Sequence, residues 1–240
     1  MPSIEVFFVL VETKYQGNIG LAARAIKNFG FNRLILVNPI CEVGREAYYR
    51  SMHAQDVLKS ARIYGSVDEF VEAEEISFLI GTTAKVGSEK NPLRIAVPLN
   101  VIREFMFPVS SRIAILFGNE ERGLKNDELS KCDIVVTIPT SEYYPTLNLA
   151  HAVVLVAYEF SLSLKTYRKL PYRPATQKEK EILCRLLSDI VEIVCYGLPE
   201  GKINIYKRIV CNIVGRAFLS GREAHSLIGI FKKVKKKISS

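Results

Sequence analysis

Apolar residues occur in short, nearly continuous runs, separated by segments whose apolar positions repeat with a helical spacing. Runs rich in Val, Ile and Phe are typical of strands buried on both faces of a parallel sheet. We predict five such strands, at 4–11, 33–38, 76–80, 112–117 and 134–138. The alternation of strands with helical segments predicts an α/β fold with a doubly wound parallel sheet and right-handed crossovers.

The segments between the strands predict helices after Gly20, at 54–61, 67–73, 97–107 and 125–130. In the first of these, Asn18 is a candidate N-cap and Gly30 a candidate C′ residue. Loops that follow parallel strands meet at one edge of the sheet, where ligands bind in such folds. Four polar or glycine-bearing loops have this position: 12–20, 81–88, 118–124 and 139–148.

A different pattern begins near residue 166. Residues 166–176 contain Pro171 and Pro174 and predict a linker. Three helices are expected after it, over 177–196, over 204–218 and from a capping box at Ser220–Glu223 onward. The predicted organisation is therefore a domain over 1–165, a linker over 166–176 and a small all-α region over 177–240.

The stretch 138–158 combines a polar loop with a long apolar helix. Because its helix is apolar nearly all round, we expect the helix to be buried. A loop that leads into a helix N-terminus presents backbone N–H groups and hydroxyls to a polar or anionic ligand. Thr146 acting simply as an N-cap, with Asn148 just inside the helix, explains these residues equally well.

Charge is distributed unevenly along the 240 residues. Residues 1–160 carry 16 Lys/Arg and 19 Asp/Glu, whereas residues 161–240 carry 17 and 6. The C-terminal third is thus basic, and we expect it to dock a nucleic acid. A solvated basic surface without a partner is the alternative.

Several classes of protein are disfavoured. Gly118 and Gly123 have Walker A spacing, but Leu124 stands where the motif needs Lys, and no G-x-G-x-x-G follows the first strand. The five cysteines form no C-x-x-C pair, so we expect no metal site and small buried thiols, with a disulfide of Cys211 left open. The three histidines lack a G-x-S-x-G partner, and His151 is expected in the core or an interface.

No apolar run reaches membrane-spanning length, and the N-terminus shows no export signal, so a cytosolic location is expected.

Three ordered segments resemble the signature motifs of the SPOUT-class RNA 2′-O-methyltransferases. They are ETKYQGNIGLAARAIKNFGF, ILFGNEERGL and IPTSEYYPTLNLAHAV. The form of the third motif, with GTTA at 81–84 and a C-terminal helical extension, is most similar to the TrmJ branch of that class.

The resemblance implies a C-terminal trefoil knot in the α/β domain, a homodimer with the site near its interface, and S-adenosylmethionine as methyl donor. It also implies methylation of a tRNA ribose at the first anticodon-loop nucleotide (position 32, cytidine or uridine). The cofactor would contact the following residues: Thr82, Thr83, Ala84, Gly118, Asn119, Glu120, Ile138, Pro139, Thr140, Leu147 and Leu149.

The resemblance also carries a catalytic set, namely Asn18, Arg24, Glu120, Thr146 and Asn148. Arg24 would position a phosphate and stabilise the developing alkoxide, because a guanidinium is essentially never deprotonated. Glu120 would order its loop or contact Arg24. Thr146 replaces the Ser usual in the family, and Ser141 is a weaker candidate. Without the motifs, Arg24 would be interpreted as an exposed helical arginine and Glu120 as a surface turn carboxylate.

Two other functions stay open on the sequence. One is 2′-O-methylation of ribosomal RNA, and the other is a non-catalytic RNA-binding scaffold. The intact catalytic set argues against the scaffold.

Overall fold

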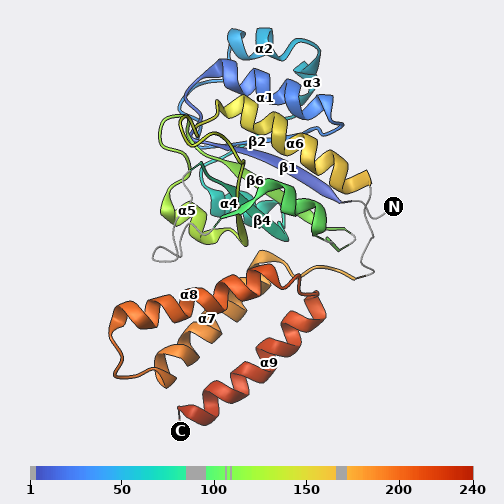
Figure 1. Cartoon of the computed structure of the whole chain (residues 1–240). Helices are drawn as coiled ribbons and strands as arrows, with labels where there is room; N and C mark the ends of the chain where they lie inside the picture. The colour runs from blue at the N-terminus through green and yellow to red at the C-terminus, as the bar shows by residue number, and fades with distance from the viewer. Residues whose placement is uncertain (1–3, 85–95, 106, 109, 166–171, 240) are drawn as a thin grey trace.

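The computed structural model describes residues 4–84, 96–105, 107–108, 110–165 and 172–239. Within them, seven parallel strands form one sheet in the order β3-β2-β1-β6-β4-β7-β5 (Figure 1). The strands are β1 Glu5–Val11, β2 Arg33–Val37, β3 Arg62–Tyr64, β4 Phe78–Thr82, β5 Ala96–Pro98, β6 Arg112–Phe117 and β7 Ile134–Thr137.

Both faces of the sheet are covered, as its continuous apolar strands require. Successive residues of β1 point to opposite sides, so Phe8 and Leu10 join one buried cluster and Phe7 and Val9 join another. One face carries α1 Gln16–Asn28 and α6 Leu149–Lys165, with α2 Arg45–Ser51, η1 Met52–Ala54 and α3 Gln55–Lys59 packed beyond α1 and η3 Leu99–Glu104 beside α6. The other face carries α4 Val67–Ala73 and α5 Asn126–Lys131.

Three C-terminal helices stand apart from the sheet and its covering helices (Figure 1). They are α7 Gln177–Val194, α8 Glu200–Arg216 and α9 Gly221–Ile238. Capping boxes open α7 at Thr176 and α9 at Ser220. Helix α7 packs against both α8 and α9 around a small buried cluster of Leu183, Val214 and Ile228.

A buried polar seam of Asp133, Gln177 and Lys180 attaches α7 to the sheet. The Lys180 ammonium donates to Asp133 Oδ1 at 2.8 Å and to the Ser77 carbonyl at 2.9 Å. The Leu79 N–H donates to Asp133 Oδ2 at 2.7 Å, and the Gln177 amide donates to the same oxygen. Burial raises the pKa of the Asp133 carboxyl, and Lys180 partly offsets this. Since Asp133 precedes β7, the seam lies at the amino ends of the strands.

The predicted parallel α/β fold is confirmed, and all five predicted strands are present. Strands β3 and β5 and helix α2 were missed, because they are short and contain no continuous run of buried apolar residues. The segment 97–107, expected to contain a helix, contains the 3-10 helix Leu99–Glu104 rather than an α-helix, and the residues before it, Ala96–Pro98, pair with β7. Asn18 is not an N-cap, since Tyr15 holds that position and Asn18 lies inside the first turn of α1. Residues 85–88 of one predicted loop and 166–171 of the predicted linker lie outside the described residues.

The sequence predicts that helix α6 is buried on all sides, but the structure shows that it is not. Val154 and Leu155 are each 38% exposed and Tyr158 is 44% exposed. His151 is also exposed, so it is not a core histidine. An apolar strip on the outside of α6 is therefore only partly covered within the described part of this chain.

The five cysteines are free thiols, each partly rather than fully buried, so the disulfide left open for Cys211 is not formed. Among the described residues, no helix has the length and apolar character needed to cross a membrane. The same residues contain no group of three or more His, Cys, Asp or Glu side chains placed to bind a metal ion.

Candidate active site

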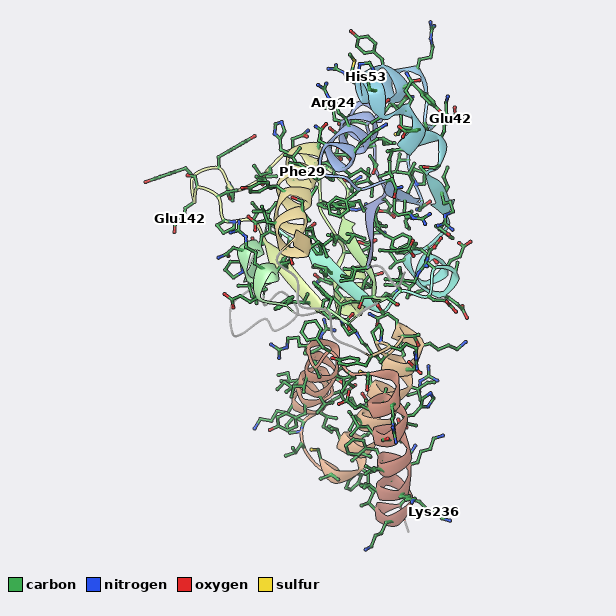
Figure 2. All side chains as sticks on the ribbon, turned by 90° about the vertical axis from the view of Figure 1, so that its right-hand side faces the viewer. Arg24, Phe29, Glu42, His53, Glu142 and Lys236 are labelled. Carbon is green, nitrogen blue, oxygen red and sulfur yellow. The ribbon has the colours of Figure 1, made fainter. Side chains whose placement is uncertain are left out.

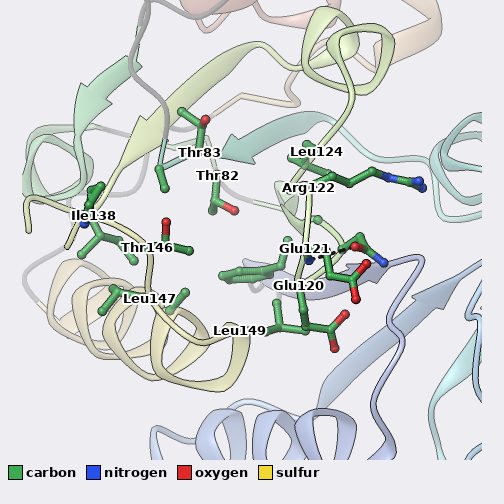
Figure 3. A pocket seen from close by; sticks show the side chains of 17 residues that line it. Thr82, Thr83, Glu120, Glu121, Arg122, Leu124, Ile138, Thr146, Leu147 and Leu149 are labelled. Carbon is green, nitrogen blue, oxygen red and sulfur yellow. Dashed lines mark hydrogen bonds between the residues drawn. The ribbon is translucent and has the colours of Figure 1, made fainter.

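A pocket opens at the carboxyl ends of β4, β6 and β7, where the sheet topology places a ligand (Figure 3). Its walls combine backbone of the loops after these strands with apolar side chains from the start of α6. The lining residues are Thr82, Thr83, Ala84, Phe117, Gly118, Asn119, Glu120, Glu121, Arg122, Gly123, Leu124, Ile138, Pro145, Thr146, Leu147, Leu149 and Ala152. We refer to it as the first pocket.

The loop 118–124 forms one wall as a tight backbone ring. The Gly123 N–H donates to the Asn119 carbonyl at 2.8 Å, and Gly123 has a φ of +72° that favours glycine. A Cβ on Gly118 would lie 2.1 Å from the Leu124 nitrogen, so only glycine fits there. Asn119 fastens the ring by donating to the Glu12 carbonyl at 2.8 Å.

Three side chains from different segments form one hydrogen-bonded chain. Asn148 accepts from the Ala150 N–H at 2.9 Å through Oδ1 and therefore caps α6. Its Nδ2 donates to Asn18 Oδ1 at 3.1 Å, and Asn18 Nδ2 donates to Glu120 Oε1 at 2.9 Å. The cap fixes the orientation of both amides, because Asn148 then presents its nitrogen to Asn18, and Asn18 presents its nitrogen to Glu120.

The second oxygen of Glu120 accepts from the Lys14 backbone N–H at 3.0 Å. Loops 12–20 and 118–124 are thus joined through one carboxylate. Nearby, Lys14 donates to Glu121 at 2.5 Å. That hydrogen bond raises the pKa of Lys14 and lowers the pKa of Glu121.

A second cleft begins on the other side of the Asn18–Asn148 hydrogen bond. It is lined by Lys14, Tyr15, Gln16, Gly17, Asn18, Leu21, Cys41, Glu46, Arg50 and Asn148. Asn18 and Asn148 line the second cleft and Glu120 lines the first pocket, so this hydrogen-bonded set, the amide chain, links the two hollows. Each amide nitrogen has a second hydrogen with which to contact a ligand. Two ligands, one in each hollow, can therefore approach each other at the amide chain.

Residues 5–158, more than half of the chain, match the SpoU rRNA Methylase family. The chain belongs to this family. The three-motif resemblance to SPOUT-class methyltransferases is thereby confirmed.

Relatives of this SpoU methylase differ in how far they match. A protein of Methanocaldococcus jannaschii named tRNA (cytidine-2′-O-)-methyltransferase TrmJ is 36% identical over 231 residues, which cover 95% of this chain and 99% of the relative. A Pectobacterium atrosepticum protein named tRNA (cytidine/uridine-2′-O-)-methyltransferase TrmJ is 37% identical over 156 residues, 65% of this chain and 63% of that protein. The crystal structure of TrmJ from Z. mobilis ZM4 superposes with a TM-score of 0.71 at 28% identity, covering 98% of this chain and 99% of that one.

Most of the residues expected to contact a cofactor in this SpoU methylase line the first pocket. Pro139 and Thr140 do not line it. Thr140 instead donates to the Pro145 carbonyl at 3.0 Å within its own loop. The lining residues that the motifs did not single out are Phe117, Glu121, Arg122, Gly123, Leu124, Pro145 and Ala152. All seven lie within the second or third motif quoted above, which is the signal that could have found them.

The expected catalytic residues of the SpoU methylase are brought together except for one. Asn18, Glu120 and Asn148 form the amide chain, and Thr146 lines the first pocket. Thr146 is not the N-cap of α6, because Asn148 has that role. Arg24 lies on the exposed side of α1 and lines neither hollow (Figure 2). Of the two roles expected for Glu120, contact with Arg24 is not made, and the carboxylate instead accepts from Asn18 and from the Lys14 backbone N–H.

Two exposed tyrosines follow Ser141 on the loop beside the pocket. Tyr143 is 98% exposed and Tyr144 is 79% exposed. Ser141 accepts from the Tyr143 N–H at 3.2 Å through its hydroxyl and from the Tyr144 N–H at 3.3 Å through its carbonyl. Figure 2 shows the neighbouring Glu142 standing off the side of the molecule. Ser141 thus braces the loop and lies outside the pocket.

Proposed function

We propose that this protein transfers a methyl group from S-adenosylmethionine to the 2′-oxygen of a tRNA ribose. The observation that carries the proposal is the archaeal TrmJ relative, which matches nearly the full length of both chains. The amide chain between two hollows supports it, since methyl donor and acceptor must meet at one point.

The first pocket suits S-adenosylmethionine in its chemistry. Its lining combines apolar side chains with a few polar groups, as in most small-molecule sites. Phe117, Leu147 and Leu149 offer apolar surface for an adenine ring, and the backbone at Thr82–Ala84 and 118–121 offers hydrogen bonds. When bound, the cofactor supplies a methyl group on a positively charged sulfur.

The protein's own residues would orient the ribose and stabilise charge. The outward amide hydrogens of Asn18 and Asn148 would direct the 2′-hydroxyl toward the first pocket, with Glu120 holding the amides in place. The hydroxyl is a poor nucleophile at neutral pH, so its proton must leave during attack, to water or to a phosphate oxygen. The Arg24 guanidinium would position a phosphate and stabilise the alkoxide.

Because Arg24 lies outside both hollows of its own chain, we propose that a second copy brings it to the site. The apolar strip of Val154, Leu155 and Tyr158 on α6 supports a homodimer, since such residues on one helix face are covered in most soluble proteins. Leu155→Glu should convert the dimer to monomers in light scattering. A variant that stays dimeric would refute this interface.

We also propose that the chain around loops 118–124 and 138–148 forms the trefoil knot of the SPOUT fold, and that the protein works in the cytosol, where tRNA is modified.

The basic C-terminal helices would contact the tRNA, and Tyr143 and Tyr144 would be available to stack on unpaired bases. Position 32, as cytidine or uridine, is the proposed target.

Methylation of ribosomal RNA is the second candidate, because the matching family is described as a family of rRNA methylases. The deciding experiment is transfer of a labelled methyl group to total tRNA and to ribosomal RNA, followed by mapping of the modified nucleotide. We expect one 2′-O-methylated nucleotide at tRNA position 32. Label in ribosomal RNA alone would favour the second candidate, and no transfer to either RNA would favour a non-catalytic scaffold.

A further inference from the structure

The second cleft is built where helix α2 approaches α1 unusually closely. A Cβ on Gly20 would lie 2.2 Å from the Ala47 carbonyl and 2.9 Å from Arg50 Cβ, and a Cβ on Gly17 would lie 2.9 Å from Glu46 Oε1. Glycine within a helix costs about 1 kcal/mol relative to alanine. Gly17 and Gly20 thus lower the stability of α1. In return they let α2 pack closely enough for Glu46 and Arg50 to line the same cleft as Asn18 and Asn148.

Among the described residues that line the cleft, Arg50 is the cation most available to a ligand. Lys14 is held by Glu121 at 2.5 Å. Arg50 faces Glu46 at 3.7 Å, and both side chains are more than half exposed, so this pair contributes little. Burial raises the pKa of the Cys41 thiol, which therefore stays neutral at the cleft wall.

A guanidinium with a weak partner is suited to a phosphate, which it can contact through two parallel N–H groups. Glu46 can only accept hydrogen bonds, so it suits the hydroxyls of a ribose or the amino groups of a base rather than a phosphate. Asn18 and Asn148 also line the cleft, and Asn18 is hydrogen-bonded to Glu120 of the first pocket. The set therefore matches a ribonucleotide with its 2′-hydroxyl toward the amides and its phosphate toward α2.

We propose that the second cleft binds the nucleotide to be methylated and that Arg50 contacts a phosphate next to its ribose. This rests on the proposed function and adds to it a substrate site and a positioning residue. The contact is electrostatic and independent of base identity, so Arg50 would set the position of the backbone while leaving base preference unchanged.

The test compares Arg50→Gln with Arg45→Gln in the full-length protein. Arg45 begins the same helix and lies outside the cleft, and its substitution removes the same charge. Binding of an unmodified tRNA transcript is measured over a series of salt concentrations, and methyl transfer is measured separately. For Arg50→Gln we expect about tenfold weaker binding near 0.1 M salt and a salt slope reduced by about 0.7–0.9, the value for one lost phosphate contact. Arg45→Gln should stay within about twofold of wild type, and Arg50→Lys should recover the slope.

Equal weakening by Arg45→Gln and Arg50→Gln would overturn the proposal, since the effect would then be one of general charge. So would an unchanged salt slope in Arg50→Gln, or a loss of cofactor binding or of oligomeric state. If the wild type methylates tRNA and Arg50→Gln behaves like it, the cleft assignment fails alone. If the wild type transfers no methyl group, the proposed function fails, while the binding measurement still reports on Arg50.

Discussion

The sheet with its covering helices and the three C-terminal helices are stabilised in different ways. The first region buries two large apolar clusters, one on each face of the sheet. In the second region only Leu183, Val214 and Ile228 form a described buried cluster, and many other isoleucines and valines are partly exposed. The C-terminal helices thus have little core of their own and depend on their attachment.

That attachment is polar as well as apolar. Phe218 stacks on Phe78 at 5.1 Å between ring centroids, and the Asp133–Lys180 pair is buried beside it with each side chain 4% exposed. Apolar contact holds two surfaces together without choosing their exact orientation, whereas a buried pair has to be matched atom by atom. The comparison therefore indicates that the basic region is held at one defined place, at the amino ends of the strands and away from the first pocket.

The largest effect is expected from breaking the seam. Asp133→Ala leaves the Lys180 ammonium buried without its carboxylate, which costs about 3–5 kcal/mol in comparable pairs. We expect the C-terminal helices to detach first, giving two transitions in urea unfolding and early proteolysis near residues 166–176. Lys178→Ala is the control, since Lys178 faces Glu72 at 3.4 Å with both side chains more than three quarters exposed. A single transition with unchanged midpoint in Asp133→Ala would show that the seam does not hold the helices.

Arg24→Ala should damage the chemistry of the first region and leave its fold intact. Loss of a group that stabilises charge in a transition state costs about 100- to 1000-fold in rate. Calorimetry with S-adenosylmethionine should give wild-type affinity, because Arg24 does not line the first pocket. Full methyl transfer to tRNA by the variant would remove Arg24 from the catalytic set.

Charge on the C-terminal helices should matter for RNA binding and not for cofactor binding. Lys232→Gln with Lys233→Gln removes two exposed charges from α9, and we expect roughly tenfold weaker tRNA binding in a filter assay at low salt. The matched double variant Arg45→Gln with Lys59→Gln removes two charges from the first region. Similar losses in both would mean that RNA contacts are not concentrated on the C-terminal helices. These substitutions are preferable to deletion of 171–240, which would uncover Asp133, Phe78 and Phe107.

A smaller, pH-dependent effect is expected at the start of α7. Arg173 donates to Glu179, and this hydrogen bond lowers the pKa of the carboxyl below its ordinary 4.5. A lowered folded-state pKa stabilises the protein above pH 4.5, and that stabilisation is lost as the pH falls through the folded-state pKa. Glu179→Gln should therefore lower the free energy of unfolding by about 1 kcal/mol at pH 7. The difference from wild type should vanish in acid, and a difference that grew in acid would contradict the assignment.

Much of the first region follows from its sequence. The continuous apolar runs identify five strands, and parallel topology brings the loops after them to one edge. Helix α2 could not be predicted from its own residues, because only Ala47 and Ser51 are buried and its position depends on glycines of another helix. The direction of Arg24 depends on the rotation of α1 about its axis, which residue spacing alone does not settle. The Asp133–Lys180 pair joins residues 47 positions apart, and no local pattern indicates it.

Gly118 has a consequence for the tolerance of this protein to sequence change. It carries no functional group, yet the nearest atoms to a Cβ there are backbone atoms of Gly123 and Leu124, which cannot rotate away. In a map of all single substitutions we therefore expect position 118 to reject every residue, including alanine, as strongly as any position that touches substrate. A search for essential residues by mutation would place it among the catalytic groups, although its whole contribution is the absence of a side chain.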